Sequence, residues 1–223
     1  MGLGVAMLSD RDVVSMPTTG FDLVRSTRYS LFEKRVVDLL IACALIAFTL
    51  PLVAIVALAI KCDSPGPILY RQERVGLGGR RFMLLKFRSM VQNAESDGQP
   101  VWAAVNDVRV TPVGRIIRRL RIDELPQLLS VLRGDMSMVG PRPERPYFVD
   151  KLTDVIPSFA ERQKVKPGIT GWAQINYPYG ASIEDAREKL AYDLYYSENR
   201  RLSLDLAILI STVRVVLSQQ GAR

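Results

Sequence analysis

The sequence predicts a mainly α-helical protein with a small β-hairpin. Three observations predict this class: an uncharged run from Leu39 to Ile60, a glycine-rich turn at residues 76–79 between two strand-like runs, and helix start and stop signals further along. We expect three parts. They are an N-terminal arm (1–30), a re-entrant membrane helix–break–helix (31–62), and a cytosolic α/β domain with interfacial amphipathic helices (63–223).

The uncharged run is long enough to enter a bilayer. As a helix it would span about 33 Å, the thickness of the hydrocarbon core. Pro51 lies inside the run and removes the backbone hydrogen bond to Ala47. Basic residues flank both ends, which favours a cytosolic position for both. We therefore expect a helix that breaks at Pro51, dips into one leaflet and returns. A transmembrane helix with a proline kink is the alternative.

Turn and capping residues divide the rest of the chain. Residues 68–75 and 80–90 are expected to pair as a hairpin, with Lys86 and Arg88 on one face of the second strand. Pro112 is expected to open a helix that ends near Ile122. Further helices are expected from Pro126 to Arg133, capped by Gly134, from Ser182 to Asn199, and from Leu202 to Leu217.

The composition excludes several kinds of chemistry. The chain has 223 residues, a net charge of +7 and no histidine. The lack of histidine excludes Ser-His-Asp triads, His-ligated zinc and any imidazole base. Acid–base or nucleophilic steps must therefore use Asp, Glu, Lys, Tyr or Cys. The positive charge favours anionic partners, which include nucleic acid, acidic lipid head groups and phosphorylated metabolites.

The strongest candidate site is the pair Asp123 and Glu124. The two carboxylates lie among arginines just before Pro126, where two helices are expected to meet. Peptide N–H groups at the start of the second helix point toward this junction, so a carboxylate there can stay ionised. Carboxylates beside guanidinium groups suit a divalent metal and a phosphate-bearing substrate. Helix capping with ion pairs to Arg118 or Arg121 is the alternative without catalysis.

A second candidate is the loop from Gly140 to Pro146, which presents Arg142 and Arg145. The prolines beside Arg142 hold it in place and reduce the entropy lost when it clamps a phosphate. Asp193 and Asp205 are expected to be structural partners of arginines. The loop, the carboxylate pair and the uncharged run together indicate phosphoryl chemistry at a membrane surface.

Several motifs in order resemble the bacterial sugar transferases, the monotopic polyprenyl-phosphate phosphoglycosyl transferases that initiate exopolysaccharide, O-antigen and glycoprotein glycan assembly. The matching segments are Lys86–Met90, Asp123–Leu128, Gly134–Pro143 and Lys166–Gly171. The resemblance covers about Phe32 to Leu217, and Gly171–Tyr177 is most similar to the exopolysaccharide branch associated with exosortase systems. Larger members carry four transmembrane helices and a further domain before the re-entrant segment. This chain resembles the minimal catalytic form, whether natural or truncated.

The resemblance implies a two-step, ping-pong reaction. A sugar 1-phosphate passes from a UDP-sugar to the enzyme with release of UMP, and then to polyprenyl (undecaprenyl) phosphate. It implies Asp123 as the nucleophile that forms an aspartyl phosphosugar, and Asp123 as a contact of Mg²⁺. Glu124 is expected to bind metal or orient the acceptor phosphate. An ionised aspartate needs no base to attack phosphorus, but the repulsion between anions must be neutralised by a metal and cations.

Basic side chains are the candidates for phosphate and nucleotide contacts: Lys86, Arg88, Arg118, Arg142 and Arg145. Lipid head groups are the alternative partners of Arg118 and Arg119. We expect as partners a UDP-sugar, polyprenyl phosphate and anionic inner-leaflet lipids, with no nucleic acid, and a homodimer is left open. The expected location is the bacterial inner membrane, with the catalytic domain facing the cytosol.

Two other function classes compete with this interpretation. A membrane-anchored basic module that binds anionic lipid or nucleic acid without catalysis leaves the carboxylate pair and the arginine-proline loop without a purpose. A membrane phosphatase or UDP-sugar hydrolase would share the first half-reaction and release sugar phosphate into water. The sequence specifies neither the sugar nor the acceptor length, because small differences in pocket shape decide among similar sugars.

Overall fold

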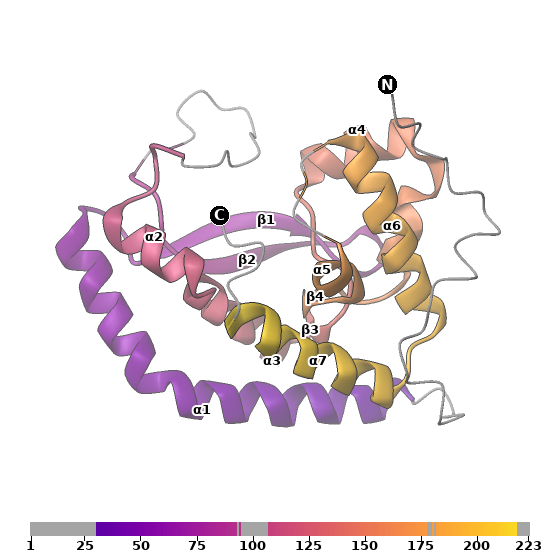
Figure 1. Ribbon diagram of the computed structural model, residues 1–223, viewed down its shortest axis with the longest axis horizontal. Helices are drawn as coiled ribbons and strands as arrows, with labels where there is room; N and C mark the ends of the chain where they lie inside the picture. The colour runs from indigo at the N-terminus through magenta and orange to yellow at the C-terminus, as the bar shows by residue number, and fades with distance from the viewer. Residues whose placement is uncertain (1–29, 93, 95–106, 178–179, 181, 218–223) are drawn as a thin grey trace, which may run out of the picture.

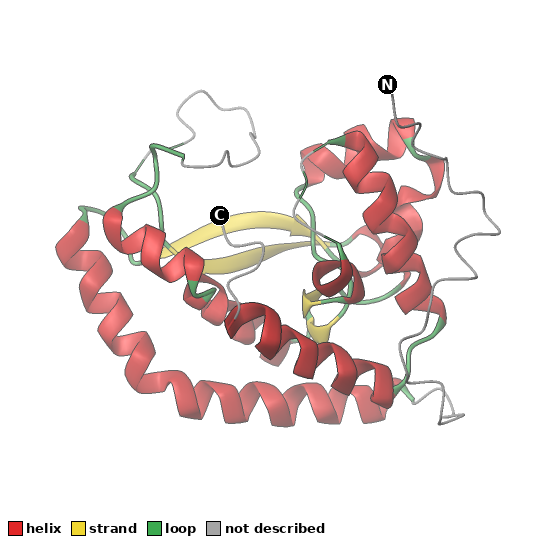
Figure 2. Ribbon diagram, in the orientation of Figure 1, coloured by secondary structure: helices red, strands yellow, loops and turns green. Residues whose placement is uncertain are grey.

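The computed structural model describes residues 30–92, 94, 107–177, 180 and 182–217, so the predicted arm lies almost entirely outside the described residues. Helices dominate, with a small antiparallel sheet, which confirms the mainly α class (Figure 2). The elements in chain order are α1 (Leu31–Asp63), β1 (Leu69–Val75), η2 (Leu77–Gly79), β2 (Arg81–Phe87), α2 (Pro112–Arg119), η3 (Ile122–Gln127), α3 (Leu128–Arg133), β3 (Ser137–Val139), α4 (Pro146–Val155), η4 (Pro157–Lys164), β4 (Gly168–Thr170), α5 (Trp172–Asn176), α6 (Ile183–Glu198) and α7 (Leu202–Leu217).

Helix α1 is continuous over 33 residues, from a capping box made by Ser30 and Glu33 through Pro51 to Asp63. The predicted break is therefore wrong. Proline removes only one backbone hydrogen bond and its ring clash is relieved by bending, so the helix bends about halfway along (Figure 1). Among the described residues, α1 is the helix that is long and apolar enough to cross a membrane, and little of its apolar stretch is buried.

The first half of α1 is fixed to the rest of the domain by polar side chains. Lys34 Nζ lies 2.7 Å from Asp205 Oδ2 on α7. The guanidinium of Arg35 donates to the carbonyls of Val131 and Leu132, at 2.6 and 2.8 Å, and so caps the end of α3. Buried Asp38 accepts hydrogen bonds from strand β3. These contacts join residues far apart in sequence.

The second half of α1 is fixed by apolar packing and by a buried arginine. Val56 and Ile60 pack against Phe87 of β2 and Ile117 of α2. The guanidinium of Arg88 donates to the carbonyls of Ser64 and Pro65, at 2.6 and 2.9 Å, just beyond the end of the helix. Both ends of α1 therefore lie against the same domain.

Asp38→Ala is expected to destabilise the protein by about 2–5 kcal/mol, since each buried donor left unpaired costs about 1–3 kcal/mol. Asp38 Oδ1 accepts from Ser137 Oγ at 3.0 Å and from the Met138 amide at 2.9 Å. Asp38→Asn is the matched control, because it keeps an acceptor oxygen. Denaturant unfolding in detergent measures both variants, and equal losses would contradict the expectation.

The described residues form two short sheets of two strands each. Strands β1 and β2 form the predicted hairpin, with Tyr70 opposite Lys86. Strands β3 and β4 pair in parallel, with Ser137 opposite Gly168. A Cβ on Gly140 would lie 2.3 Å from the Lys166 carbonyl oxygen, so the backbone approach beside this sheet requires glycine.

Most predicted helix boundaries are confirmed. Thr111 caps α2 before Pro112, Gly134 ends α3 with a φ of 92°, and Ser182 forms a capping box with Asp185 at α6. The helix predicted from Pro126 instead begins at Leu128, because residues 122–127 form a 3-10 turn that contains Pro126. Helix α7 has the predicted bounds.

Candidate active site

The 3-10 turn η3 places Asp123 and Glu124 side by side in the interior. Each is only 8% exposed. The turn follows Arg121, whose backbone is left-handed with a φ of 57°, an uncommon conformation for a residue other than glycine. Such strain is often found at functional sites. The backbone change at Arg121 separates α2 from η3 and turns the chain into the carboxylate pair.

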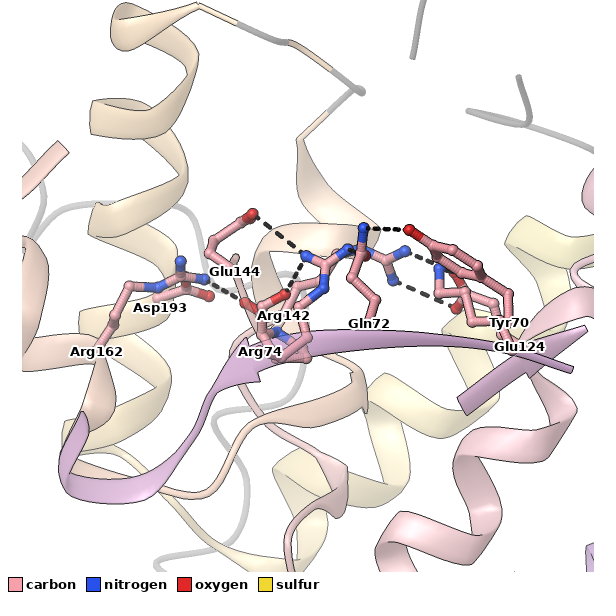
Figure 3. Close-up of polar contacts among 10 residues, drawn as sticks. Tyr70, Gln72, Arg74, Glu124, Arg142, Glu144, Arg162 and Asp193 are labelled. Atoms are coloured by element: carbon pink, nitrogen blue, oxygen red, sulfur yellow. Dashed lines mark hydrogen bonds and ion pairs between the residues drawn. The ribbon is translucent and has the colours of Figure 1, made fainter. Parts of the chain in front are cut away.

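Glu124 receives the basic side chains. Lys86 Nζ lies 3.2 Å from Oε1. Arg142 donates to Oε1 at 2.6 Å and to Oε2 at 3.3 Å, and Figure 3 shows Arg142 beside Glu124. Burial alone would raise the pKa of Glu124, but Arg142 and Lys86 outweigh it and hold the pKa well below 4.5. Glu124 in turn raises the pKa of Arg142 above its usual range. Glu124 is therefore an ionised anchor for two cations.

Asp123 has a different environment, although it is the neighbouring residue. Lys86 and Arg142 direct their hydrogen bonds to Glu124. Burial and repulsion from Glu124 raise the pKa of Asp123 to about 6, against a smaller opposing effect of Lys86 and Arg142. The two carboxylates are thus pushed apart in proton affinity, a pattern typical of catalytic pairs. Among the described residues, Asp123 is therefore the carboxylate of the pair to which Lys86 and Arg142 do not donate.

The structure brings together four of the predicted site residues: Asp123, Glu124, Lys86 and Arg142. Half-buried Arg118, in the last turn of α2, is close enough to lower the pKa of Asp123 slightly. Arg145 is the N-cap residue of α4 and lies near Arg74, whose pKa is lowered mainly by burial and to a smaller extent by Arg142 and Arg145. Arg88 was predicted on the second strand, on one face with Lys86, but it lies just beyond the end of β2 and donates to the backbone after α1.

Sequence reasoning missed two arginines next to Arg142, half-buried Arg74 and buried Arg162. Arg74 Nη1 donates to the Pro143 carbonyl at 2.8 Å, and Arg162 Nη2 donates to the Arg142 carbonyl at 2.9 Å. Arg162 also pairs with Asp193 at 2.7 Å, which confirms the expected arginine partner for Asp193. Asp205 pairs with Lys34, at 2.7 Å. No motif in the sequence marked Arg74 or Arg162.

A magnesium ion fits this donor set only together with substrate. In the described ranges, no three Asp, Glu, Cys or His side chains gather as a metal cluster. Mg²⁺ is commonly held by one or two carboxylates plus substrate phosphates. Asp123, a buried carboxylate whose charge is poorly compensated, is the residue suited to contact it.

A small cavity of about 20 Å³ lies beside the Arg142 loop, with Val75, Arg162 and Pro167 among its lining residues. It has room for about one water molecule, so it is not a substrate pocket. A long apolar helix fixed to a domain that holds a carboxylate pair among cations indicates an enzyme acting on phosphate groups at a membrane.

Comparison with known proteins agrees with this class. The family model described as bacterial sugar transferase matches residues 29–219. The UDP-N-acetylgalactosamine-undecaprenyl-phosphate N-acetylgalactosaminephosphotransferase of Aeromonas hydrophila is 48% identical over 192 residues, which are 86% of this chain and 45% of that protein. The UDP-glucose:undecaprenyl-phosphate glucose-1-phosphate transferase of Caulobacter vibrioides is 42% identical over 225 residues, 100% of this chain and 80% of that protein.

A third relative, the uncharacterized sugar transferase EpsL of Bacillus subtilis, is 42% identical over 192 residues, 84% of this chain and 89% of that protein. The chain belongs to the bacterial sugar transferase family. This confirms the resemblance found in the sequence and the prediction of a transferase. The chain spans less than half of the Aeromonas protein and most of the other two.

Proposed function

We propose that this protein transfers a sugar 1-phosphate from a UDP-sugar to undecaprenyl phosphate, releasing UMP, through an aspartyl phosphosugar on Asp123. The observation that carries the proposal is the division between the two carboxylates: Glu124 binds the cations, and Asp123 stays unpaired by them. The names of the Aeromonas and Caulobacter relatives support this donor and acceptor.

In the first step, a carboxylate oxygen of Asp123 attacks the phosphorus that bears the sugar. The bond from that phosphorus to the bridging oxygen breaks, and its electron pair leaves with UMP. In the second step, an oxygen of polyprenyl phosphate attacks the same phosphorus and frees Asp123. Neither step needs a proton to be moved, which suits a chain without histidine.

The cations of the site offset the repulsion between Asp123 and the anionic donor. Lys86 and Arg142 bind Glu124, the residue next to Asp123, and this contact already orients both cations. Arg118, on the neighbouring helix, adds a third positive charge. Mg²⁺, held by Asp123 and the donor phosphates, would supply further neutralisation when bound.

The proposed membrane arrangement is re-entrant, with the domain on the cytosolic face of the inner membrane. The attachment of both ends of α1 to one domain supports a position of both ends on the same side of the bilayer. Apolar side chains of α7 also face outward along one helical stripe: Leu206, Ile210, Val213 and Leu217. Such a stripe suits the membrane interface. The reaction would then be the first membrane step of exopolysaccharide or glycan assembly.

Cysteine labelling tests this arrangement. With Cys43 and Cys62 replaced by serine, Leu31→Cys and Asp63→Cys mark the two ends of α1. An impermeant maleimide is expected to label both in inverted vesicles and neither in spheroplasts. Labelling of one of them in spheroplasts would show a transmembrane helix.

The function is tested by trapping the intermediate. Purified protein in detergent receives Mg²⁺ and a UDP-sugar labelled in the sugar, without acceptor, and is then denatured. We expect label on the peptide that contains Asp123, equimolar UMP, and transfer of the label to polyprenyl phosphate when it is added. Steady turnover with no adduct at Asp123 would refute the mechanism. Steady release of labelled sugar phosphate into water in the absence of acceptor would indicate a hydrolase.

A further inference from the structure

The loop that carries Arg142 is held through its carbonyl groups. Pro141 and Pro143 have no N–H, so the loop has few donors of its own. Four successive carbonyls accept hydrogen bonds from other elements. Pro141 accepts from the Gly168 amide at 2.9 Å and Glu144 from the Val75 amide at 2.9 Å. The carbonyls of Arg142 and Pro143 accept from the guanidinium groups of Arg162 and Arg74.

The donor to Arg142 itself is part of a buried ion pair. Arg162 is 9% exposed and Asp193 is 2% exposed. Asp193 comes from α6 and lies 2.7 Å from Arg162 Nη2 (Figure 3). The same nitrogen lies 2.9 Å from the Arg142 carbonyl. Asp193 thus orients the group that fixes the backbone of Arg142.

Stability alone is a weak reason to keep such a pair. Removing two charges from water is costly, and replacing a buried ion pair by apolar residues of similar size is often neutral or stabilising. A buried pair does fix direction, because it holds one geometry. Here the geometry that it holds is that of the residue whose guanidinium spans both oxygens of Glu124.

We propose that Arg162 and Asp193 are positioning residues for the transfer reaction, which act by holding Arg142 against Glu124. This inference rests on the proposed function. Neither residue touches the reacting carboxylate in the structure. Their effect passes through the Arg142 carbonyl to the Arg142 side chain, and from there to the countercharge that receives the donor diphosphate.

The test uses Arg162→Met together with Asp193→Leu, which removes the pair without leaving a buried charge unpaired. We expect the unfolding midpoint of this double variant to stay near that of the wild type. The rate of UMP release is expected to fall about 10–100-fold, the scale of a catalytic group misplaced by about an ångström. The loss is expected mainly in kcat, because the donor still meets the same side chains.

A double-mutant cycle separates positioning from general loosening. In an Arg142→Ala background, the double variant is expected to change the rate by less than about threefold, because the group that it positions is already gone. Leu190→Ala is the matched control. Leu190 is buried in the cluster with Phe159, one turn before Asp193 on the same helix. Its replacement by alanine is expected to loosen α6 without changing either member of the ion pair.

The inference would be overturned if the Arg162→Met and Asp193→Leu changes lowered the rate of UMP release by the same factor in the wild-type and Arg142→Ala backgrounds. An unchanged rate in the double variant would also overturn it. A loss in Leu190→Ala as large as in the double variant, with the same factor in both backgrounds, would assign the effect to packing. The wild-type protein is assayed in parallel. If the wild type itself releases no UMP, the proposed function fails, which is distinct from failure of the positioning role.

Discussion

Asp123→Asn is expected to abolish UMP release while making the folded protein more stable. The amide has no anionic oxygen to attack phosphorus, so the half-reaction without acceptor is expected to fall by roughly 10⁴-fold or more, the scale seen when a nucleophile is removed. A radiometric or coupled assay of UMP measures this loss. Release at the wild-type rate would remove Asp123 from the role of nucleophile.

The gain in stability follows from the environment of Asp123. Its folded pKa of about 6 lies above the ordinary value of 3.8, because burial and Glu124 disfavour its charge. The folded protein then binds more protons than the unfolded chain between these values. Stability from this group is therefore present at low pH and is lost as pH rises through about 6. The neutral amide escapes this penalty, which we expect to be about 1–3 kcal/mol at neutral pH.

Unfolding midpoints in detergent with a metal chelator, measured between about pH 5 and pH 8, test this expectation. The stabilisation by Asp123→Asn is expected to grow with pH. Glu124→Gln is the matched control with the opposite sign, because it leaves Lys86 and Arg142 without their anionic partner. A variant at position 123 that is less stable than the wild type at pH 8 would contradict the account of Asp123.

Arg142→Ala is expected to lower the rate of UMP release by about 100–1000-fold, the range seen when a preorganised charge-stabilising donor is removed. The variant loses the bidentate partner of Glu124 and keeps the bond from Lys86. The rate of Arg142→Lys is expected to lie between those of the wild type and Arg142→Ala, because one ammonium group does not reproduce the two parallel hydrogen bonds of the guanidinium.

The same change is expected to destabilise the fold at neutral pH. Arg142 holds the pKa of Glu124 well below 4.5, so its contribution is present above that pH and is lost as pH falls through the folded value. Arg133→Ala, on the exposed end of α3, removes one positive charge away from the pair and serves as the control. If Arg133→Ala slowed the reaction equally, net charge and not the bond to Glu124 would explain the effect.

Elements with local signals could be predicted from the sequence. Pro112, Gly134 and Ser182 act on the backbone within a few residues, and each marks the helix end that the structure has. The hairpin was predicted because its turn and strands are adjacent. Pro126 misled the prediction, since it lies inside the 3-10 segment and precedes the start of α3 by two residues, and nothing local distinguishes that case.

The candidate site was predictable in its carboxylates and in Arg142, because their motifs are compact. Its supporting contacts were not. Arg88 and Lys86 have the same alternation, yet one caps α1 and the other binds Glu124. Arg162 meets Asp193 only after η4 and α6 pack together. Partners of this kind depend on tertiary structure, so a single sequence shows which side chains are charged but not which residues they contact.

The anchoring of α1 has a consequence for how the protein is made. Lys34 meets Asp205, a residue 171 positions further along the chain. The ribosome therefore delivers α1 long before the residue that pairs with Lys34 exists. The contact that fixes the first turn of α1 can form only after synthesis has passed Asp205, so the exposed apolar side chains of the helix emerge well before the domain can close on it.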